Sequence, residues 1–564
     1  MVQDILKIFI ENGFLLDREM LDFLNELKDE DIAKEIIDKI AIVSKKKMIT
    51  KNLVSENFEK LKPVLFDLGD EKKKLVEKFF VNVSISVEVK KETHFEEKKV
   101  ETRSPIKVIS SPILASQKLE VKDFVKNFRN RYVFLKNILQ QKTDLENLTS
   151  IDKLKNNNNR NFSIIGIITE KNVTKNKNII LHVEDLTDSV KLLINQNREE
   201  VFAKAKELLI DDVVGFKCSG SKDFLFVNDL FYPDCYVSEK HKSETETYAL
   251  FLSDIHVGSS MFLKNNFERF LEWIEGKNGD GVQKELIKKI KYVFITGDNV
   301  DGVGIYPGQE KFLSIKDIKE QYVVLADYLK RIPNHMNIIM CAGQHDGVRV
   351  AEPQPPIGED FGEPLYKIPN LYLVSNPSMV EIEGRNGRQG IRVLMYHGAS
   401  MHPLIGEIED LRLTNAHRNP TRAVKHLLLR RHLNPMHGAG VYIPNAEEDP
   451  LLIREIPDIV ATGDLHRTDI DKYNGILLIA GSCWQSITPF EEKVGNIPDP
   501  CKVPMLNLKT GALKILDFSD AEEEIKEVEC KEVKNGDSEN VSGSSNAIDK
   551  KEIVCEIEVK KQNG

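Results

Sequence analysis

Five short motifs rich in aspartate, histidine and glycine constrain this chain more than any other feature of its sequence. They are residues 254–256 (Asp-Ile-His), 297–299 (Gly-Asp-Asn), 343–346 (Gly-Gln-His-Asp), 397–398 (His-Gly) and 463–466 (Gly-Asp-Leu-His). Each follows a run of apolar, β-prone residues, which predicts a buried strand that ends in a polar loop. Because ligands bind beyond such strand ends when a sheet is covered on both faces, we expect the five loops to form one site.

The side chains in these loops suit a pair of divalent metal ions. Carboxylate oxygens and imidazole nitrogens are ligands for hard or borderline cations. Two such ions about 3.5–4 Å apart activate a water molecule and clamp a phosphorus centre. A single Asp-x-His after a strand is more often a turn or a cap than a ligand, whereas five motifs in series favour the metal site.

The order of the motifs resembles that of the calcineurin-like metallophosphoesterases. Further segments resemble the small subunits of archaeal D-family DNA polymerases, namely residues 123–132, 300–309, 480–490 and 497–500. This similarity extends from about residue 123 to about residue 518. It implies a 3′–5′ exonuclease that proofreads DNA in a heterodimer with a large polymerising subunit. It also implies kinship with eukaryotic polymerase B-subunits, which share the layout but have lost the metal ligands.

The resemblance implies a role for each motif residue. Asp254, His256 and His466 would hold the first metal ion, and Asp298 would bridge both ions. His397, Gln344 and Asp464 would hold the second ion. His345 would donate a proton or hydrogen bond to the scissile phosphate, as an imidazole free of metal can near neutral pH. The implied cofactors are two divalent ions, Mn²⁺ or Mg²⁺.

Two positions depart from the family pattern, and both belong to the second metal ion. Gln344 stands where the family usually has asparagine, and Asp464 where it has histidine. Aspartate is a competent ligand that shifts the preference toward Mn²⁺ or Mg²⁺. The extra methylene of glutamine requires the carbonyl to fold back or the loop to shift. An intact two-metal site and a weakened second site therefore both stay open.

Three neighbours of the motifs have ambiguous roles. We expect Asn299 to cap a turn at a strand end. Asp346 is either a similar loop residue or a carboxylate that orients the imidazole of His345 or His256. His402 is interpreted as a loop or substrate-side residue.

The chain is predicted to be a multidomain α+β protein. The expected parts are a helical docking domain at 1–80, a flexible linker at 81–120, a helix plus an OB-fold β-barrel at 121–240, a two-sheet αββα calcineurin-like phosphoesterase domain at 241–518, and an acidic, disordered tail at 519–564. The barrel prediction depends on three strands, a helix and two more strands after residue 161. A scaffolding role is favoured over a platform for single strands.

The charge distribution bears on DNA binding. The net charge is −10, and residues 519–564 hold 13 acidic and 7 basic side chains, so the rest of the chain carries only about −4. A basic cluster in the catalytic region is expected to contact DNA phosphates: Arg418, Arg422, Arg430, Arg431 and Arg467. Part of it lies on a helix predicted over residues 421–433. The alternative is a solvated helix face or a contact with an acidic partner.

The remaining features agree with a cytoplasmic, nucleoid-associated enzyme. The 7 cysteines are scattered without CxxC pairs, which indicates reduced thiols. No apolar run approaches the ~20 residues of a membrane span, and the first residues do not read as a signal peptide. No polymerase motif is present, so DNA synthesis is assigned to the large catalytic subunit as partner. The expected substrate is DNA, in particular single-stranded 3′ ends and mismatched primer termini.

Three classes of function stay open. The first is the proofreading 3′–5′ exonuclease of a heterodimeric polymerase. The second is a structural B-subunit whose degenerate metal site only scaffolds the large subunit, against which the retained ligands argue. The third is a stand-alone phosphoesterase for a small phosphoester, which would need neither the barrel nor the segment at residues 484–500.

Overall fold

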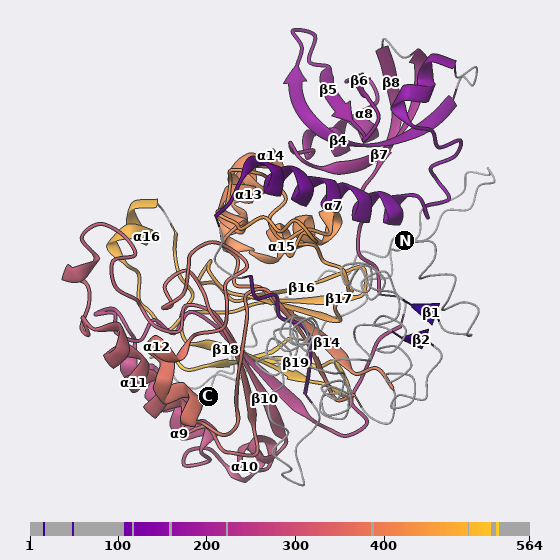
Figure 1. Ribbon diagram of the computed structural model, residues 1–564. Helices are drawn as coiled ribbons and strands as arrows, with labels where there is room; N and C mark the ends of the chain where they lie inside the picture. Colours follow the sequence, from indigo (N-terminus) through magenta and orange to yellow (C-terminus); the bar gives the residue numbers. More distant parts are fainter. Residues whose placement is uncertain are drawn as a thin grey trace, which may run out of the picture. The chain divides into compact units, whose positions relative to one another are not determined.

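The computed structural model describes ten ranges of the 564-residue chain: 15–16, 48–49, 106–114, 118–156, 161–221, 224–237, 239–384, 388–494, 496–519 and 526–528 (Figure 1). The chain divides into two compact units, residues 1–102 and 103–564. In the first unit the described residues form a parallel pair of short strands, β1 (Leu15–Leu16) and β2 (Met48–Ile49). The helical domain predicted for residues 1–80 otherwise lies outside the described residues, as does most of the predicted tail.

Two mixed sheets form the centre of the second unit. The first sheet has the order β12-β11-β10-β9-β18-β19-β20 and the second β16-β17-β15-β14-β13-β3. Strands of the first sheet are β9 (Tyr248–Leu252), β10 (Ile290–Thr296), β11 (Asn337–Cys341), β12 (Leu371–Val374), β18 (Lys502–Asn507), β19 (Leu513–Asp517) and β20 (Lys526–Val528). Strands of the second are β3 (Lys107–Ser110), β13 (Ser378–Ile382), β14 (Ile391–Met395), β15 (Ile459–Thr462), β16 (Asp469–Tyr473) and β17 (Ile476–Ala480).

The two sheets share one apolar layer. Phe251 and Phe294 from the first sheet pack in the same cluster as Val393 and Ala461 from the second. The two phenylalanine rings are stacked with their centroids 5.2 Å apart. Strands buried on both faces explain why the sequence shows continuous apolar runs here instead of alternation.

Helices cover the outer face of each sheet. The first sheet is covered by α9 (Lys264–Ile274), α10 (Gly281–Lys288) and α11 (Ile318–Leu329), and the second by α13 (Met401–Glu407), α14 (Glu409–Leu413) and α15 (Thr421–Arg430). Within the described ranges, the smaller helices are α12 (Glu359–Gly362), α16 (Pro489–Val494) and four 3₁₀ turns, Ile151–Asn156, Gln309–Lys311, Glu363–Lys367 and Ala416–Arg418. Spacing of three and four residues places Phe267, Phe270 and Ile274 on the buried face of α9. The layers follow the predicted helix–sheet–sheet–helix order.

The flexible linker predicted over residues 81–120 is wrong for residues 107–110. These residues form β3, which pairs antiparallel with β13 at the edge of the second sheet. Ile106 and Val108 pack against the layer between the sheets. The strand is hard to predict from the sequence because it is short and its flanks are charged. Two apolar side chains on one face are enough to form a strand when the edge of a sheet is available for pairing.

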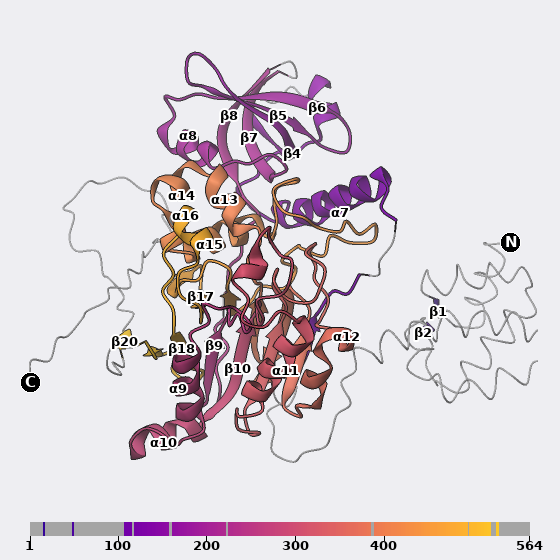
Figure 2. The ribbon, with the colours of Figure 1, turned by 90° about the vertical axis from the view of Figure 1, so that its left-hand side faces the viewer.

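A closed five-stranded barrel precedes the two sheets in sequence. Its order is β4-β5-β6-β8-β7, with helix α8 (Glu199–Lys206) between the third and fourth strands. The strands are β4 (Asn161–Val173), β5 (Ile179–Glu184), β6 (Ser189–Ile194), β7 (Val213–Ser221) and β8 (Phe224–Phe231). The predicted succession of three strands, a helix and two strands is therefore present. In both ribbon views the barrel stands at one end of the two-sheet region (Figure 2).

Helix α7 (Val121–Leu139) joins the barrel to the two-sheet region. Tyr132 and Leu135 pack on the barrel, and the Tyr132 hydroxyl donates to the carbonyl of Ile165 at 2.9 Å. The Phe124 ring instead contacts the ring of His437, outside the barrel, at a centroid distance of 5.6 Å. The apolar face of α7 thus contacts two partners, the barrel and the ring of His437.

Buried ion pairs hold these parts together. Arg131 on α7 donates to Asp449 at 2.8 Å, and His432 approaches the same carboxylate at 2.9 Å. Arg430 at the end of α15 donates to Asp212 in the barrel at 2.9 Å. All of these side chains are buried, so each charge depends on its partner for solvation.

We expect Arg430→Ala to lower the free energy of unfolding by about 3–5 kcal/mol, because it leaves the Asp212 carboxylate buried without its cation. Burial already raises the pKa of Asp212. Without Arg430 this carboxyl can take up a proton and become neutral, so we expect the loss in unfolding free energy to lie near the lower end of that range. The measurement is the denaturant midpoint of the purified chain. Arg418→Ala is the control, because that side chain is exposed. Equal midpoints for both variants and the wild type would contradict this role for the pair.

Within the described residues, no helix combines the length and apolar character needed to cross a membrane.

Candidate metal centre

The loops at the ends of five strands meet at one edge of the two sheets. Strands β9, β10 and β11 of the first sheet run parallel, as do β14 and β15 of the second. Their carboxyl ends carry the motif residues: Asp254 and His256 after β9, Asp298 after β10, Gln344 and His345 after β11, His397 after β14, and Asp464 and His466 after β15. The structure therefore brings all five predicted loops together.

The backbone at this edge is held in an unusual conformation. Left-handed φ values occur at five non-glycine residues of the motifs: Asp254 (51°), His256 (53°), Asp298 (49°), Asp464 (68°) and His466 (54°). Such conformations cost about 1–3 kcal/mol each and concentrate at functional sites. Gly343 has a related role, because a Cβ there would collide with the Asp298 carboxylate. The backbone of these loops therefore orients the motif side chains toward one another at a cost in local stability.

Asp254, His256 and His466 form a first group of possible ligands. One oxygen or nitrogen from each lies within 4.8 Å of the others. The Nε2 atoms of His256 and His466 are 3.1 Å apart, and His466 Nε2 is 3.5 Å from Asp254 Oδ1. Two nitrogens and a carboxylate oxygen at these separations can face a single cation.

Two further carboxylates hold the imidazoles of the first group. His256 Nδ1 lies 3.2 Å from Asp301 Oδ1, and His466 Nδ1 lies 2.8 Å from Glu491 Oε1. A carboxylate on Nδ1 directs Nε2 into the site and raises its basicity. Sequence reasoning assigned no role to either residue, although both fall near segments that carry the family resemblance.

Asp298 lies between the two halves of the centre. Its Oδ2 is 3.9 Å from His256 Nε2, and its Oδ1 is 3.3 Å from His397 Nε2. Burial raises the pKa of this carboxyl, but the charges of His397 and His345 outweigh burial and hold the pKa well below its usual range. Asp298 is therefore ionised and faces both groups, which is the position a bridging ligand requires.

His397, Gln344 and Asp464 surround the second position. His397 Nδ1 donates to the carbonyl of Thr296 at 2.8 Å, so Nε2 is the nitrogen that faces the carboxylates of the site. Gln344 Nε2 donates to Asp464 Oδ1 at 3.0 Å. Among the described residues, three buried atoms here have no hydrogen-bond partner: His397 Nε2, Gln344 Oε1 and Asp464 Oδ2.

These three atoms test whether the chain fits a second cation. A buried polar atom without a partner costs about 1–3 kcal/mol, so three together are unusual in a stable protein. All three are electron-pair donors, and a divalent cation would satisfy them at once. The donor set with Gln344 and Asp464 thus fits a hard cation despite its departure from the family pattern.

A buried amide pair supports the second group from behind. The Asn376 side-chain oxygen accepts from the His397 backbone N–H at 2.9 Å, and Asn376 Nδ2 donates to Gln354 Oε1 at 2.8 Å. Gln354 Nε2 in turn donates to the carbonyl of Gly343 at 3.0 Å. The pair ties the loop of Gln344 to the strand end of His397. Nothing in the sequence singles out these two residues, since both lie outside the motifs.

His345 differs from the other histidines in its exposure. Its Nδ1 donates to the carbonyl of Asp301 at 2.9 Å, and its Nε2 stands 3.9 Å from Asp298 Oδ2. Its side chain is 22 % exposed, whereas that of His397 is 0 % exposed. His345 is therefore partly exposed beside Asp298.

Asp346 does not orient either imidazole. It accepts from the backbone N–H of Asn299 and of Gly343, and from the Tyr322 hydroxyl at 2.9 Å. Burial raises the pKa of Asp346 to about 6. Its role is to join two motif loops, and the carboxylate that orients His256 is Asp301. Although Asp346 follows His345 in the sequence, its carboxylate points into the protein and does not contact the His345 imidazole.

The arginines predicted to contact DNA differ in how buried they are. Arg430 and Arg431 are 3 % and 7 % exposed, and they pair with Asp212 and with the carbonyl of Ile453, so their assignment to DNA phosphates is wrong. The helix ends at Arg430, and Arg431 has a left-handed φ. Arg418 is exposed, while Arg422 pairs with Asp410 and Arg467 donates to the carbonyl of Ile497.

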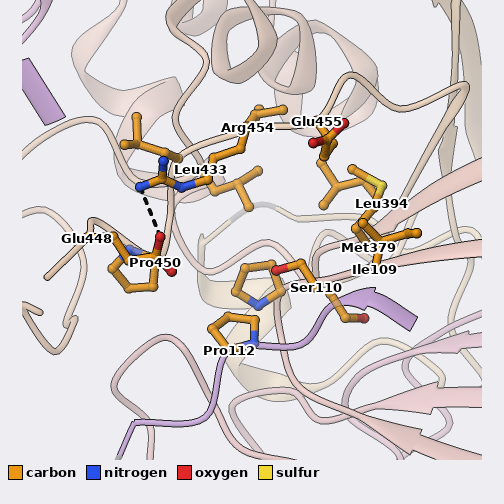
Figure 3. Close-up of a pocket in the computed structure, with 14 residues that line it drawn as sticks. Ile109, Ser110, Pro112, Met379, Leu394, Leu433, Glu448, Pro450, Arg454 and Glu455 are labelled. Atoms are coloured by element: carbon orange, nitrogen blue, oxygen red, sulfur yellow. Dashed lines mark ion pairs between the residues drawn. The ribbon is translucent and has the colours of Figure 1, made fainter. Parts of the chain in front are cut away.

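A pocket of about 260 Å³ lies apart from these loops (Figure 3). Strand β3 forms one side through Ile109, and Met379 and Leu394 lie on the wall. Glu448 and Arg454 form an ion pair at 3.3 Å on its rim. None of the motif residues lines it, so it is not part of the candidate metal centre.

We expect Asp301→Asn to weaken metal binding at the first position by about 10–100-fold, because the amide cannot support the His256 imidazole as a carboxylate does. Titration of the metal-free full chain with Mn²⁺ in a calorimeter measures this change. Asp327→Asn is the matched control, because Asp327 is exposed on α11. An unchanged affinity in Asp301→Asn would show that the 3.2 Å contact does not tune the ligand.

Comparison with known proteins identifies relatives of this chain. Residues 249–470 match the family of B subunits of DNA polymerase alpha/epsilon. Proteins named DNA polymerase II small subunit are similar over most of the chain. The one from Pyrococcus furiosus is 37 % identical over 71 % of this chain and 64 % of its own length, so the chain spans less than two thirds of that relative. The one from Methanothermobacter thermautotrophicus is 35 % identical over 71 % and 80 %, and that from Archaeoglobus fulgidus 31 % identical over 88 % and 94 %.

Solved structures with weaker similarity include an archaeal phosphodiesterase, at 14 % identity and a TM-score of 0.25 over 48 % of this chain and 99 % of that one. Vps29 from Entamoeba histolytica in complex with Zn²⁺ has 13 % identity and a TM-score of 0.24 over 50 % and 98 %.

Proposed function

Because the chain belongs to the family of archaeal DNA polymerase II small subunits, we propose that it carries the 3′–5′ exonuclease of a heterodimeric replicative DNA polymerase. Its partner would be the large catalytic subunit, and its substrate the 3′ end of a DNA strand, including mismatched primer termini. The single observation that carries this proposal is the set of buried ligand-type atoms beside Asp298 that have no hydrogen-bond partner: His397 Nε2, Gln344 Oε1 and Asp464 Oδ2. A polypeptide that only scaffolds its partner has no use for them.

The residues present fit two divalent cations. Asp254, His256 and His466 would hold the first, Asp298 both, and His397, Gln344 and Asp464 the second: Mn²⁺ or Mg²⁺ suits a set with three carboxylates and an amide. Bound there, the ions would supply an activated water and neutralise charge on the phosphodiester.

The chain's own residues account for the rest of the reaction. Asp301 and Glu491 keep the Nε2 atoms of the two first-group histidines facing inward. Water attacks the terminal phosphorus in line, and the bond from phosphorus to the 3′ oxygen breaks. His345 donates the proton that the leaving 3′ oxygen takes up. The products are a 5′-mononucleotide and a strand with a new 3′ hydroxyl.

The barrel is proposed to be an OB-fold that acts as a scaffold. Its strand order supports this, and the Arg430–Asp212 pair joins it to the helices over the second sheet. The arginines of the basic cluster that are not buried, Arg418, Arg422 and Arg467, are proposed to contact the DNA backbone near the site.

The test is an incubation of the purified full chain, alone and with its large subunit, with 5′-labelled and 3′-labelled single-stranded DNA. Mn²⁺, Mg²⁺ or EDTA is added to parallel reactions. Stepwise loss from the 3′ end with metal, and none with EDTA, is the expected result. Intact DNA in both assemblies, with the two proteins folded and associated, would identify the chain as a structural component instead.

A further inference from the structure

Two loops beside the first metal-binding group expose apolar side chains. The first loop, residues 301–309, follows the Asp298 motif, and the second, residues 485–499, contains α16. Val303 and Ile305 on the first are 46 % and 36 % exposed, and Ile487 and Ile497 on the second are 43 % and 50 % exposed. We call these four side chains, together with Tyr306, the apolar rim. Single exposed apolar residues are ordinary, but these four lie on the two loops that hold the first metal-binding group, and that placement requires an explanation.

The first loop is attached to the metal-binding group. Gln309 is buried, donates to Asp301 Oδ2 at 3.1 Å and accepts from the Ile305 backbone N–H at 2.9 Å. Asp301 is the carboxylate that holds His256. The position of Ile305 is therefore coupled through two hydrogen-bonding side chains to a predicted metal ligand.

The second loop is attached in the same way. Thr488 donates to Glu491 Oε2 at 2.9 Å, and Glu491 holds His466. The backbone N–H of Asp499 donates to the carbonyl of His466 at 2.8 Å. Thr488, next to Ile487, and Asp499, two residues after Ile497, are therefore both connected to the other histidine of the group.

The two loops meet beside the first metal-binding group. The Nε2 atoms of His256 and His466 are 3.1 Å apart, and Gln485 at the start of the second loop donates to Asp301 Oδ1 at 3.2 Å. Tyr306 on the first loop is half-buried, and burial followed by the charges of Asp301 and Glu491 raises its pKa.

We propose that the apolar rim binds the unstacked nucleobase at the 3′ terminus of a DNA strand. This inference rests on the proposed exonuclease and specifies which state of its substrate is recognised. A base offers its flat apolar faces only when it has left the stack, and aromatic and aliphatic side chains bind these faces without reading the sequence. Unstacking is least costly at a mismatched or frayed end. The rim therefore favours the ends that proofreading must remove.

The test compares two 5′-labelled oligonucleotides of equal length, one of thymidines and one with two abasic residues at its 3′ end. The full chain, with its large subunit if activity needs it, should show a kcat/KM about 10-fold higher on the first. Tyr306→Ala combined with Ile497→Ser should reduce this ratio to about 1. Tyr306→Phe should keep the ratio, because the stacking ring remains. Val282→Ser is the matched control, since Val282 is 78 % exposed on α10.

A second measurement separates this proposal from the proposed exonuclease. Fluorescence anisotropy with the same two oligonucleotides in EDTA reports binding without hydrolysis. One outcome is that no metal supports hydrolysis, while the thymidine strand binds more tightly than the abasic strand and the rim variant loses this preference. The exonuclease proposal then fails and the rim proposal stands. A rim variant that keeps the wild-type preference in both assays would overturn the proposal. Weaker association with the large subunit, with that preference intact, would also overturn it and mark the rim as a protein contact.

Discussion

Asp298→Ala is expected to lower the rate of 3′-end hydrolysis by about 10⁴-fold or more, because both metal positions lose their shared ligand. Asp298 is the carboxylate that faces both groups, at 3.9 Å from His256 Nε2 and 3.3 Å from His397 Nε2. Without its charge, the two ions would repel each other with no bridging anion between them. The rate is measured as stepwise shortening of 5′-labelled single-stranded DNA in Mn²⁺.

The control for this variant is Asp327→Ala, which removes an exposed carboxylate on another helix. Calorimetric titration with Mn²⁺ should show fewer bound ions in Asp298→Ala and an unchanged number in the control. Circular dichroism would establish that both variants are folded. Hydrolysis by Asp298→Ala at the wild-type rate would mean that the reaction does not take place at this centre.

His345→Ala is expected to reduce turnover by about 10²–10⁴-fold while leaving metal affinity unchanged, because the role proposed for His345 is that of a general acid and not of a ligand. The geometry distinguishes this residue from its neighbours. Its Nδ1 is engaged by the carbonyl of Asp301, and its partly exposed side chain reaches the solvent side of the centre. Single-turnover rates on labelled DNA, with Mn²⁺ titrations in parallel, measure the two quantities separately.

His335→Ala provides the matched control, because His335 is exposed and lies outside the motif loops. Loss of Mn²⁺ affinity in His345→Ala would assign this imidazole to the metal set instead. Wild-type turnover in the same variant would leave His345 without a catalytic role. Turnover and Mn²⁺ affinity together therefore distinguish a general acid from a metal ligand, whereas turnover alone does not.

The motif loops show how far sequence reasoning reaches in this protein. The motif residues can be singled out as candidate ligands because Asp, His and Gly at a strand end have few other uses when the pattern recurs five times. The two departures, Gln344 and Asp464, were also visible, but their consequence was open. Only the structure places Gln344 Oε1 and Asp464 Oδ2 together as buried atoms without partners.

The errors have a common physical origin. Arg430 and Arg431 were assigned to DNA because they are basic and lie on a predicted helix, yet both are buried, one against the barrel and the other against a neighbouring loop. A sequence shows which face of a helix is apolar. It does not show that a charged side chain on that helix is buried, because the burial depends on a partner that lies far away in the sequence. Asp212 lies 218 positions from Arg430.

The sequence by itself determined the local structures of this protein: buried strands that end in ligand-bearing loops, a barrel of short alternating strands, and the family to which they belong. These depend on residue type and spacing over a few positions, where sterics and solvation act directly. Tertiary structure alone decided the contacts between distant segments. It placed Asp301 and Glu491 behind the histidines, the Asn376–Gln354 pair behind the second position, and β3 at a sheet edge. Such contacts join residues that gain stability only when the whole fold brings them within hydrogen-bonding distance, so no local pattern records them.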